Sequence, residues 1–385
     1  MAGGGVGALS LGTVLAACTK GVVGGGSTRR VVDFANWPLY IDRAKDPDGN
    51  PYSPSLRRFA LDTGIDVNYR QVIEDPEAFF RQIEGWLVAG EPTGWDVMVI
   101  TNGPTLTTLM DLRYLEPLPQ GQRPNFDANA SDTVKDPAYD PNNRFTMPWQ
   151  SAITGIAYDP RLTNRPVTSL RDLFDPAFKG RVGMFGDDTD QPNLALLAVG
   201  ADPETSTPDD WQRAAALLTR QRAEGIVRGY SQQGYVKALS RGEFAITMAR
   251  SGDIFRQKRA GLAPGIEFVV PREGALIRID SMCIPKSALH PEDAIKLMDY
   301  VYRPEIAALI TASVGYISPV PAARAQILKM AGRAPGSQAE ELQHLANSSL
   351  VFPSAKDTAR LHTYRVLDHE DEILEWDRIF SPFFA

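Results

Sequence analysis

Residues 53–69 read SPSLRRFALDTGIDVNY, which predicts a short helix followed at once by a strand. Ser53 suits the position that caps a helix, and Pro54 suits the first turn, because no backbone donor is needed there. Apolar residues then recur at helical spacing, and Gly64 indicates the helix end. Residues 65–69 alternate between apolar and polar side chains, as a half-buried strand does. A helix that leads directly into a strand is typical of α/β folds.

The same alternation continues on both sides of this stretch. Residues 29–35 predict a buried strand before it, and a helix at 76–89 and a strand at 95–100 follow it. Further strands are predicted at 181–184, 244–248 and 266–270, and further helices at 209–222 and 291–302. Strands that alternate with helices form βαβ units and a mostly parallel sheet. Since 385 residues are too many for one core, which stops growing at roughly 250–300 residues, we expect two α/β lobes.

The composition excludes several classes of function. The formal net charge is −7, whereas a nucleic-acid partner selects a basic surface. The two cysteines, Cys18 and Cys283, cannot form a disulfide framework, and the histidines have no metal-ligand spacing. The sequence contains no serine-nucleophile elbow, phosphate-binding loop, zinc-protease motif or dinucleotide fingerprint. We therefore expect no enzyme activity, no cofactor, no metal and no nucleic-acid partner.

The N-terminus is typical of an exported lipoprotein. Residues 6–17 form a short apolar run. It ends in Leu15-Ala16-Ala17-Cys18, which resembles a bacterial lipobox. This predicts a signal peptide at 1–17, a lipid on Cys18, and a glycine-rich flexible tether at 18–28. No lysine or arginine precedes the apolar run, so the usual positive segment is missing. The alternative is a buried helix with a free cysteine. We expect a periplasmic or cell-surface protein that is lipid-anchored to the membrane.

Several strings in the mature chain resemble one family when they are taken in order. They lie at residues 36–41, 59–69, 95–99, 148–158, 169–182, 251–253, 280–285, 302–305 and 315–316. Together they resemble the bacterial spermidine/putrescine-binding proteins, the polyamine-type periplasmic solute-binding proteins of ABC transporters. The resemblance covers nearly all of the mature chain.

The resemblance implies a two-lobe periplasmic-binding-protein fold of type II, with two crossover strands and a ligand cleft between the lobes. Lobe 1 would comprise residues 29–150 and 275–320, and lobe 2 would comprise residues 151–274 and 321–385. The lobes would close on a small amine by a hinge motion and deliver it to the permease subunits and their ATPase. We expect a monomer.

The resemblance also implies a set of ligand-binding positions. An amine needs carboxylates for charge-assisted hydrogen bonds and aromatic faces for cation–π contact. The matched positions are Trp37, Tyr40, Thr101, Asp188, Gln191, Arg250, Asp253, Arg278, Asp280 and Tyr316. For Asp188 the alternative is a helix cap, and for Trp37 and Tyr40 it is simple core packing.

Three of these positions, and also Gly103, depart from the family pattern. Arg250 and Arg278 stand where the family commonly has aromatic residues, Gln191 replaces an acidic residue, and Gly103 replaces an aromatic one. Guanidinium groups repel a polyamine but bind carboxylate or phosphate bidentately. Two ligand classes therefore stay open. One is a polyamine, with the arginines paired to Asp188, Asp253 or other nearby carboxylates; the other is an amine that also bears an acidic group, such as an ω-amino acid, an opine-like conjugate or a phosphonate. A sensor that signals to a membrane receptor is an alternative role for the same fold.

Overall fold

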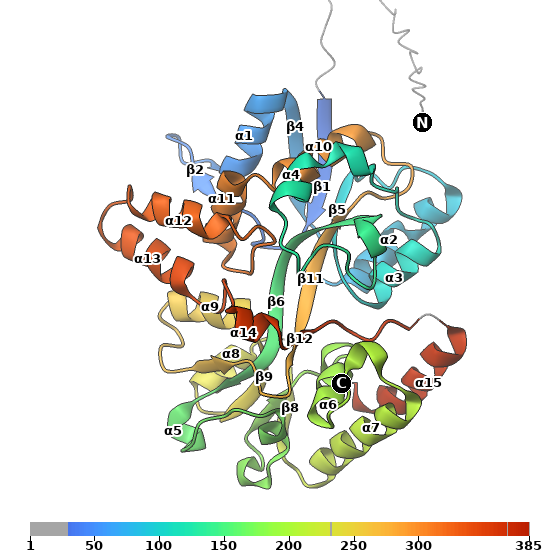
Figure 1. Ribbon diagram of the computed structural model, residues 1–385, viewed down its shortest axis with the longest axis vertical. Coiled ribbons are helices and arrows are strands. Elements are labelled where there is room, and N and C mark those ends of the chain that lie inside the picture. Colours follow the sequence, from blue (N-terminus) through green and yellow to red (C-terminus); the bar gives the residue numbers. More distant parts are fainter. Residues whose placement is uncertain (1–29, 232, 368, 385) are drawn as a thin grey trace, which may run out of the picture.

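The computed structural model describes residues 30–231, 233–367 and 369–384 (Figure 1). The strands are β1 (Arg30–Asn36), β2 (Ala44–Lys45), β3 (Pro51–Tyr52), β4 (Ile65–Gln71), β5 (Val97–Thr101), β6 (Thr146–Tyr158), β7 (Val182–Met184), β8 (Val227–Tyr230), β9 (Ile246–Arg250), β10 (Glu267–Val269), β11 (Ala275–Cys283) and β12 (Leu361–His362). The predicted signal peptide at 1–17, the tether at 18–28 and Cys18 lie outside the described residues.

Most of the α-helices in the described residues begin at a proline in the first turn or at a capping side chain. They are α1 (Pro54–Thr63), α2 (Pro76–Ala89), α3 (Pro104–Asp111), α4 (Pro124–Asn129), α5 (Pro160–Thr163), α6 (Asp190–Ala198), α7 (Pro208–Ala223), α8 (Tyr235–Ser240), α9 (Ser251–Arg259), α10 (Pro291–Tyr300), α11 (Pro304–Val314), α12 (Ala323–Ala331), α13 (Gly336–Asn347), α14 (Ala355–Thr358) and α15 (Glu370–Phe380). Short 3-10 turns connect several of them.

Helix α1 and strand β4 form as residues 53–69 predict. The hydroxyl of Ser53 accepts a hydrogen bond from the backbone N–H of Leu56 at 3.3 Å, which caps the helix. Gly64 ends it in the left-handed conformation, with φ at 71°, where a side chain would be strained. The chain then enters β4, which pairs in parallel with β1.

One continuous sheet runs through the molecule in the order β4-β1-β5-β11-β6-β9-β7-β8. The outer pairs on each side are parallel, β1 with β4 and β5, and β7 with β8 and β9. The two central strands pair antiparallel with each other and with their neighbours β5 and β9. Figure 1 shows β6 and β11 crossing from one half of the molecule to the other. This is the expected two-lobe fold, with β6 and β11 as its crossover strands.

Each lobe has its own core. In the first lobe, alternate residues of one strand enter different clusters, since Phe34 packs on one face of the sheet and Ala35 on the other. Helices α2 and α3 cover the second face through Phe79, Ile83 and Leu106. The second lobe has a separate cluster around the fully buried Trp211. Two cores agree with the number of lobes that the chain length predicts.

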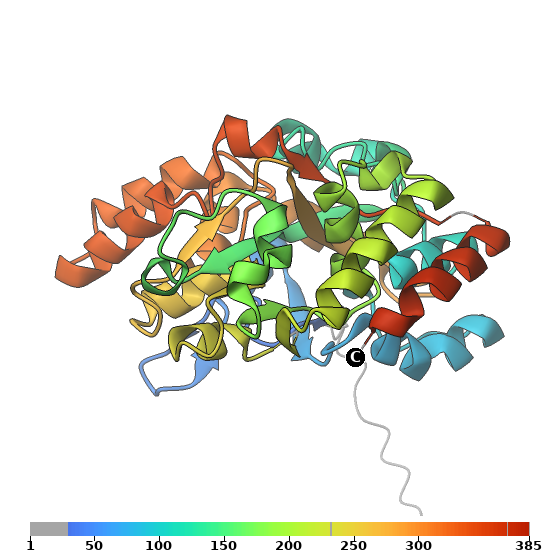
Figure 2. The same cartoon turned by 90° about the horizontal axis from the view of Figure 1, so that it is seen from below.

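The last segment of the chain divides between the lobes. Ile327 of α12 and Leu342 of α13 join the core of the first lobe, whereas Tyr364 and Trp376 join that of the second. Figure 1 shows α12 and α13 beside α11, and Figures 1 and 2 both show α15 beside α7. We therefore propose that the first lobe extends beyond residue 320 to include α12 and α13, and that only the end of the 321–385 segment belongs to the second lobe.

Candidate functional site

The predicted site residues come from strand ends and loops of both lobes. Trp37 and Tyr40 follow β1, Thr101 ends β5, and Asp280 and Arg278 lie on one face of β11. From the second lobe, Arg250 ends β9 and Asp253 lies in the first turn of α9. Tyr316 follows α11. Because the carboxyl ends of neighbouring strands meet at one edge of a sheet, these positions converge between the lobes.

Asp280 is the centre of the first group of contacts. The hydroxyl of Tyr40 donates to one carboxylate oxygen at 2.6 Å, and the hydroxyl of Thr101 donates to the other at 2.5 Å. Arg278 lies on the same side, with its Nε 3.7 Å from the carboxylate. Burial and the Asp280 charge raise the pKa of Tyr40 well above its usual value, so this phenol stays a donor. The Asp280 carboxylate is therefore satisfied by the protein's own groups.

Arg278 is the cation that lies beside the Asp280 carboxylate. Its guanidinium donates to the Thr101 hydroxyl at 2.8 Å and lies over the Trp37 ring, 5.9 Å from the ring centroid. The indole N–H of Trp37 donates to the carbonyl of Val99 at 3.0 Å, which fixes the orientation of the ring. A carboxylate, a hydroxyl and an aromatic face thus surround one cation that belongs to the chain itself.

Asp253 forms a second group of contacts. It accepts from Arg256 at 2.6 Å, from the hydroxyl of Tyr235 at 2.7 Å and from that of Tyr316 at 3.0 Å. Burial opposes its ionisation, but Arg256 and Tyr235 outweigh burial and hold its pKa below the ordinary value. The ring of Tyr316 packs edge-on against that of Tyr40, with centroids 5.2 Å apart. The two tyrosines thus connect Asp253 of one lobe to Asp280 of the other.

Arg250 pairs with carboxylates that sequence reasoning did not select. Its guanidinium lies 2.9 Å from Asp190 and 3.9 Å from Asp187, and over the ring of Phe185 at 4.7 Å. The hydroxyl of Tyr364 donates to Asp190 at 2.8 Å. Burial and the neighbouring Asp190 charge raise the pKa of Asp187 to about 7.

Asp188 and Gln191 lie apart from this group. The Asp188 side chain is exposed and accepts from the hydroxyl of Thr189 at 2.9 Å. Gln191 is buried against Phe185 and Phe383, on the side of the C-terminal segment. Its backbone N–H donates to Asp187 at 3.0 Å. The structure therefore brings Asp187 and Asp190 to the arginine, where the sequence match selected Asp188 and Gln191.

Gln150 is a further polar residue at the site. It lies opposite Asp280 in the pairing of β6 with β11. Its amide nitrogen donates to the carbonyl of Trp149 at 2.7 Å, while its amide oxygen is buried with no hydrogen-bond partner among the described residues. A buried, unpaired acceptor beside a carboxylate is suited to a donor group from a ligand. The string PWQS contains Gln150, but no pattern in the neighbouring sequence indicated this role.

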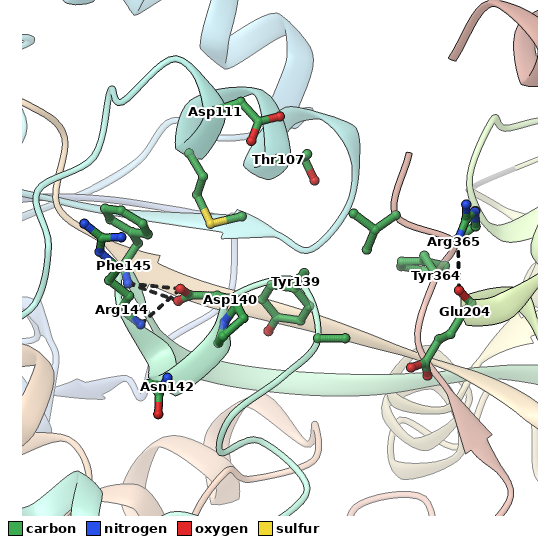
Figure 3. A pocket seen from close by; sticks show the side chains of 14 residues that line it. Thr107, Asp111, Tyr139, Asp140, Asn142, Arg144, Phe145, Glu204, Tyr364 and Arg365 are labelled. Carbon is green, nitrogen blue, oxygen red and sulfur yellow. Dashed lines mark hydrogen bonds between the residues drawn. The ribbon is translucent and has the colours of Figure 1, made fainter. Parts of the chain in front are cut away.

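A pocket of about 580 Å³ opens beside these contacts (Figure 3). One wall consists of α3 residues and the loop at 138–145, and the opposite wall consists of Glu204, Tyr364, Arg365 and Val366. Figure 3 shows Tyr139 between the two walls, and its hydroxyl lies 3.5 Å from that of Ser281, next to Asp280. Tyr364, on the far wall, is hydrogen-bonded to Asp190. The pocket thus lies between the lobes, but none of the predicted site residues lines it. It is connected to their contacts through Tyr139, which neighbours Ser281, and through Tyr364, which is hydrogen-bonded to Asp190.

Within residues 30–231, 233–367 and 369–384, no group of three or more histidine, cysteine or acidic side chains could hold a metal ion. None of the helices in those ranges combines the length and apolar character that a bilayer span requires. Two α/β lobes, joined by crossover strands and enclosing charged and aromatic side chains, define the class of two-lobe solute-binding proteins.

The comparison with known families agrees with this class. The family model of bacterial extracellular solute-binding proteins matches residues 95–335, and the chain belongs to that family. It is therefore a binding protein and not an enzyme. A relative, the putrescine-binding periplasmic protein of Escherichia coli K12, is 26% identical over 357 residues, which cover 88% of each chain.

Solved structures support the fold. The spermidine/putrescine ABC transporter substrate-binding protein of Streptococcus pneumoniae superposes with a TM-score of 0.72 at 20% identity, covering 92% of this chain and 98% of that one. An Agrobacterium tumefaciens binding protein in complex with agropinic acid superposes with a TM-score of 0.57 at 18% identity, covering 92% and 96%. The two-lobe type II fold is thus shown. Because the fold is shared by proteins with such different ligands, it does not select the ligand of this chain.

Proposed function

We propose that this protein is the extracytoplasmic substrate-binding subunit of an ABC importer and that its ligand is a small organic amine. The observation that carries the proposal is the pair of carboxylates, Asp280 and Asp253, that lie where the two lobes meet. Tyr40 and Tyr316 connect them, and the indole face of Trp37 lies beside Asp280. Carboxylates and aromatic faces are the groups that recognise an ammonium ion.

The relatives support the same ligand class. The Escherichia coli relative is named for putrescine and the Streptococcus pneumoniae structure for spermidine and putrescine. The latter is described as an ABC transporter substrate-binding protein, which supports a role in delivering the ligand to permease subunits driven by their ATPase. Loss of ligand uptake when the gene is deleted would support an importer, whereas intact uptake with a lost cellular response would indicate a sensor.

The proposal includes a lipid anchor on Cys18 and a mature chain that starts there. The lipobox-like string at 15–18 and the glycine-rich tether behind it support this anchor. Mass spectrometry of the native N-terminus should find an acylated Cys18 and no residues 1–17. We further propose that the mature protein works as a monomer, which analytical ultracentrifugation of the soluble domain would test.

Titration calorimetry tests the amine. The soluble domain should bind at least one compound from a panel of diamines, polyamines and ω-amino acids. Asp280→Asn should weaken that binding by at least about 30-fold, because it removes the charge that pairs with the ammonium ion. Asp188→Asn is the matched control, since the exposed Asp188 carboxylate lies outside the site and its loss should leave the affinity unchanged. No binding of any amine, or full binding by Asp280→Asn, would contradict the proposed function.

A further inference from the structure

We propose that the ligand is a zwitterion whose ammonium group binds at Asp280 and whose carboxylate binds to Arg278 and Arg250. This inference rests on the proposed function and narrows its ligand class. The contacts that carry it are those of the two arginines, both of which lie in the interlobe site with side chains only 21% and 14% exposed.

The charged groups between the lobes nearly balance one another. Three guanidinium groups, those of Arg250, Arg256 and Arg278, meet the carboxylates of Asp190, Asp253 and Asp280 in direct contacts. Asp187 adds a carboxyl group that titrates near neutral pH. The site is therefore nearly neutral before any ligand arrives. A diamine or triamine would leave buried positive charge without partners, which costs several kcal/mol, whereas a zwitterion keeps the balance.

Arg278 already occupies the partners that an ammonium ion would need at Asp280. Its guanidinium holds the Thr101 hydroxyl, the Trp37 face and the neighbourhood of Asp280. An incoming ammonium ion can take these partners only if the guanidinium moves away. A diamine offers nothing to receive the displaced cation. A ligand with a carboxylate offers it a bidentate partner, so the exchange conserves ion pairs.

Arg250 has a hydrogen-bond donor that the described part of the chain leaves unpaired. Its Nε–H is buried with no hydrogen-bond partner among the described residues. Burial and the positive charge of Arg250 both act to lower the pKa of Arg278, and the charges of Asp280 and other neighbours outweigh them, so Arg278 stays charged and the two guanidiniums repel each other. An anionic group placed between the two arginines would relieve this repulsion and supply an acceptor for the free N–H. Both needs point to the same kind of ligand group.

Calorimetry with a matched series of ligands tests the proposal. Putrescine, 5-aminovalerate and adipate share the same tetramethylene chain and differ only in their end groups; the same comparison is made at shorter and longer chain lengths. At the chain length that fits best, the ω-amino acid should bind at least about 30-fold more tightly than the diamine and the dicarboxylate. Arg278→Gln should weaken the amino acid by a similar factor and narrow or reverse its advantage over the diamine. Arg228→Gln, an exposed arginine of the second lobe, is the matched control.

The outcomes separate this inference from the proposed function. If a diamine or spermidine binds most tightly and Arg278→Gln leaves the ratio of affinities unchanged, the acidic group is disproved while the amine-binding function stands. If the dicarboxylate binds most tightly, or if no amine binds at any length, the proposed function falls together with the inference. The wild-type series decides between these results without any variant, so a poorly folded Arg278→Gln protein would not block the test.

Discussion

The carboxyl groups of Asp187 and Asp190 compete for one cation, the guanidinium of Arg250. Asp187 and Asp190 both lie within reach of Arg250, but Asp190 has the closer contact and a further donor in Tyr364. Burial and the Asp190 charge accordingly raise the pKa of Asp187 to about 7, far above that of an aspartate in an unfolded chain. The folded state thus holds a proton that the unfolded state releases. The contribution of Asp187 to stability therefore falls as the pH rises from about 4 towards 7.

We predict that Asp187→Asn raises the melting temperature at pH 8 but not at pH 4. The amide lacks the charge that is penalised above pH 7, and its oxygen can still accept from the backbone N–H of Gln191. A gain of at least about 1 kcal/mol, or roughly 2–4 °C, is expected at pH 8. Thermal melts at both values measure it, with Asp132→Asn as the exposed control, because the charge of Asp188 itself helps to raise the pKa of Asp187. An equal effect at the two pH values would mean that Asp187 is ionised throughout.

Gly252 shows how closely the site is packed. A Cβ atom at this position would lie 2.5 Å from the ring of Tyr316, so alanine must push the tyrosine away from Asp253 and Tyr40. Gly252→Ala should therefore weaken ligand binding, by about tenfold if the strain resembles that of an overpacked core. Stability should change less, because alanine favours helix α9. Calorimetry and melting curves check this, with Gly265→Ala as control, since a Cβ there meets nothing within 4 Å. Unchanged affinity would remove Tyr316 from the site.

At the scale of single elements, local signals account for most boundaries. Helix α2 spans Pro76–Ala89, as predicted, because Asp75 caps its start and Gly90 its end. Strand β6 was expected only from the family resemblance. Its thirteen residues are all buried, so they show no alternation that could distinguish a strand. The capping residues carry boundary information in the sequence itself, whereas a strand covered on both faces depends on neighbours that are distant along the chain.

The same limit applies to the site. Residues that end a strand, such as Thr101 and Arg250, could be placed from the sequence because the strand fixes where their side chains go. The run at 187–191 could not, because it turns from β7 into α6 over a few residues. Rotation of the helix start by one residue exchanges Asp187 and Asp190 for Asp188 and Gln191. The packing of α6 against α7 and β11 sets that rotation.

Helix α15 connects the C-terminal segment to the core of the second lobe, and we predict that it contributes to the stability of that lobe. Its Trp376 is buried and packs edge-on against Trp211 of α7, with ring centroids 5.3 Å apart. Trp376→Ala should cost about 3–5 kcal/mol, because it leaves a large cavity in the core of the second lobe. Leu374→Ala on the same helix is the control, since Leu374 is 60% exposed, and it should change stability by less than about 0.5 kcal/mol. Urea unfolding compares the two variants. It is followed by far-UV circular dichroism, because that signal does not depend on the tryptophan that is removed. Equal, small losses would show that α15 is not part of the second core.

At the scale of the whole molecule, the two lobes meet through α9, whose Phe255 packs into the core of the first lobe and stacks on His344, and through polar contacts around Tyr316. Tyr316 of the first lobe donates to Asp253 of the second, and Arg256 lies over the same tyrosine ring. The strands β6 and β11 are the main covalent connections, and the segment between α13 and β12 is a third, since α13 joins the first core and Tyr364 joins the second. Such an arrangement allows the lobes to separate by bending at the crossover strands while each core stays intact.

We predict that ligand binding compacts the protein. A ligand held by Asp280 of one lobe and Arg250 of the other binds the closed arrangement more tightly than the open one, so it must shift the population towards closure. Small-angle X-ray scattering should give a smaller radius of gyration with saturating ligand than without it. Asp253→Asn, which removes the charge that holds Tyr316 and Arg256, should enlarge the ligand-free protein or leave it as open as the wild type, but should not make it more compact. A compound that calorimetry shows not to bind serves as the control. Identical scattering with and without a tightly bound ligand would mean that the lobes are fixed and that the permease must recognise the ligand by some feature other than closure.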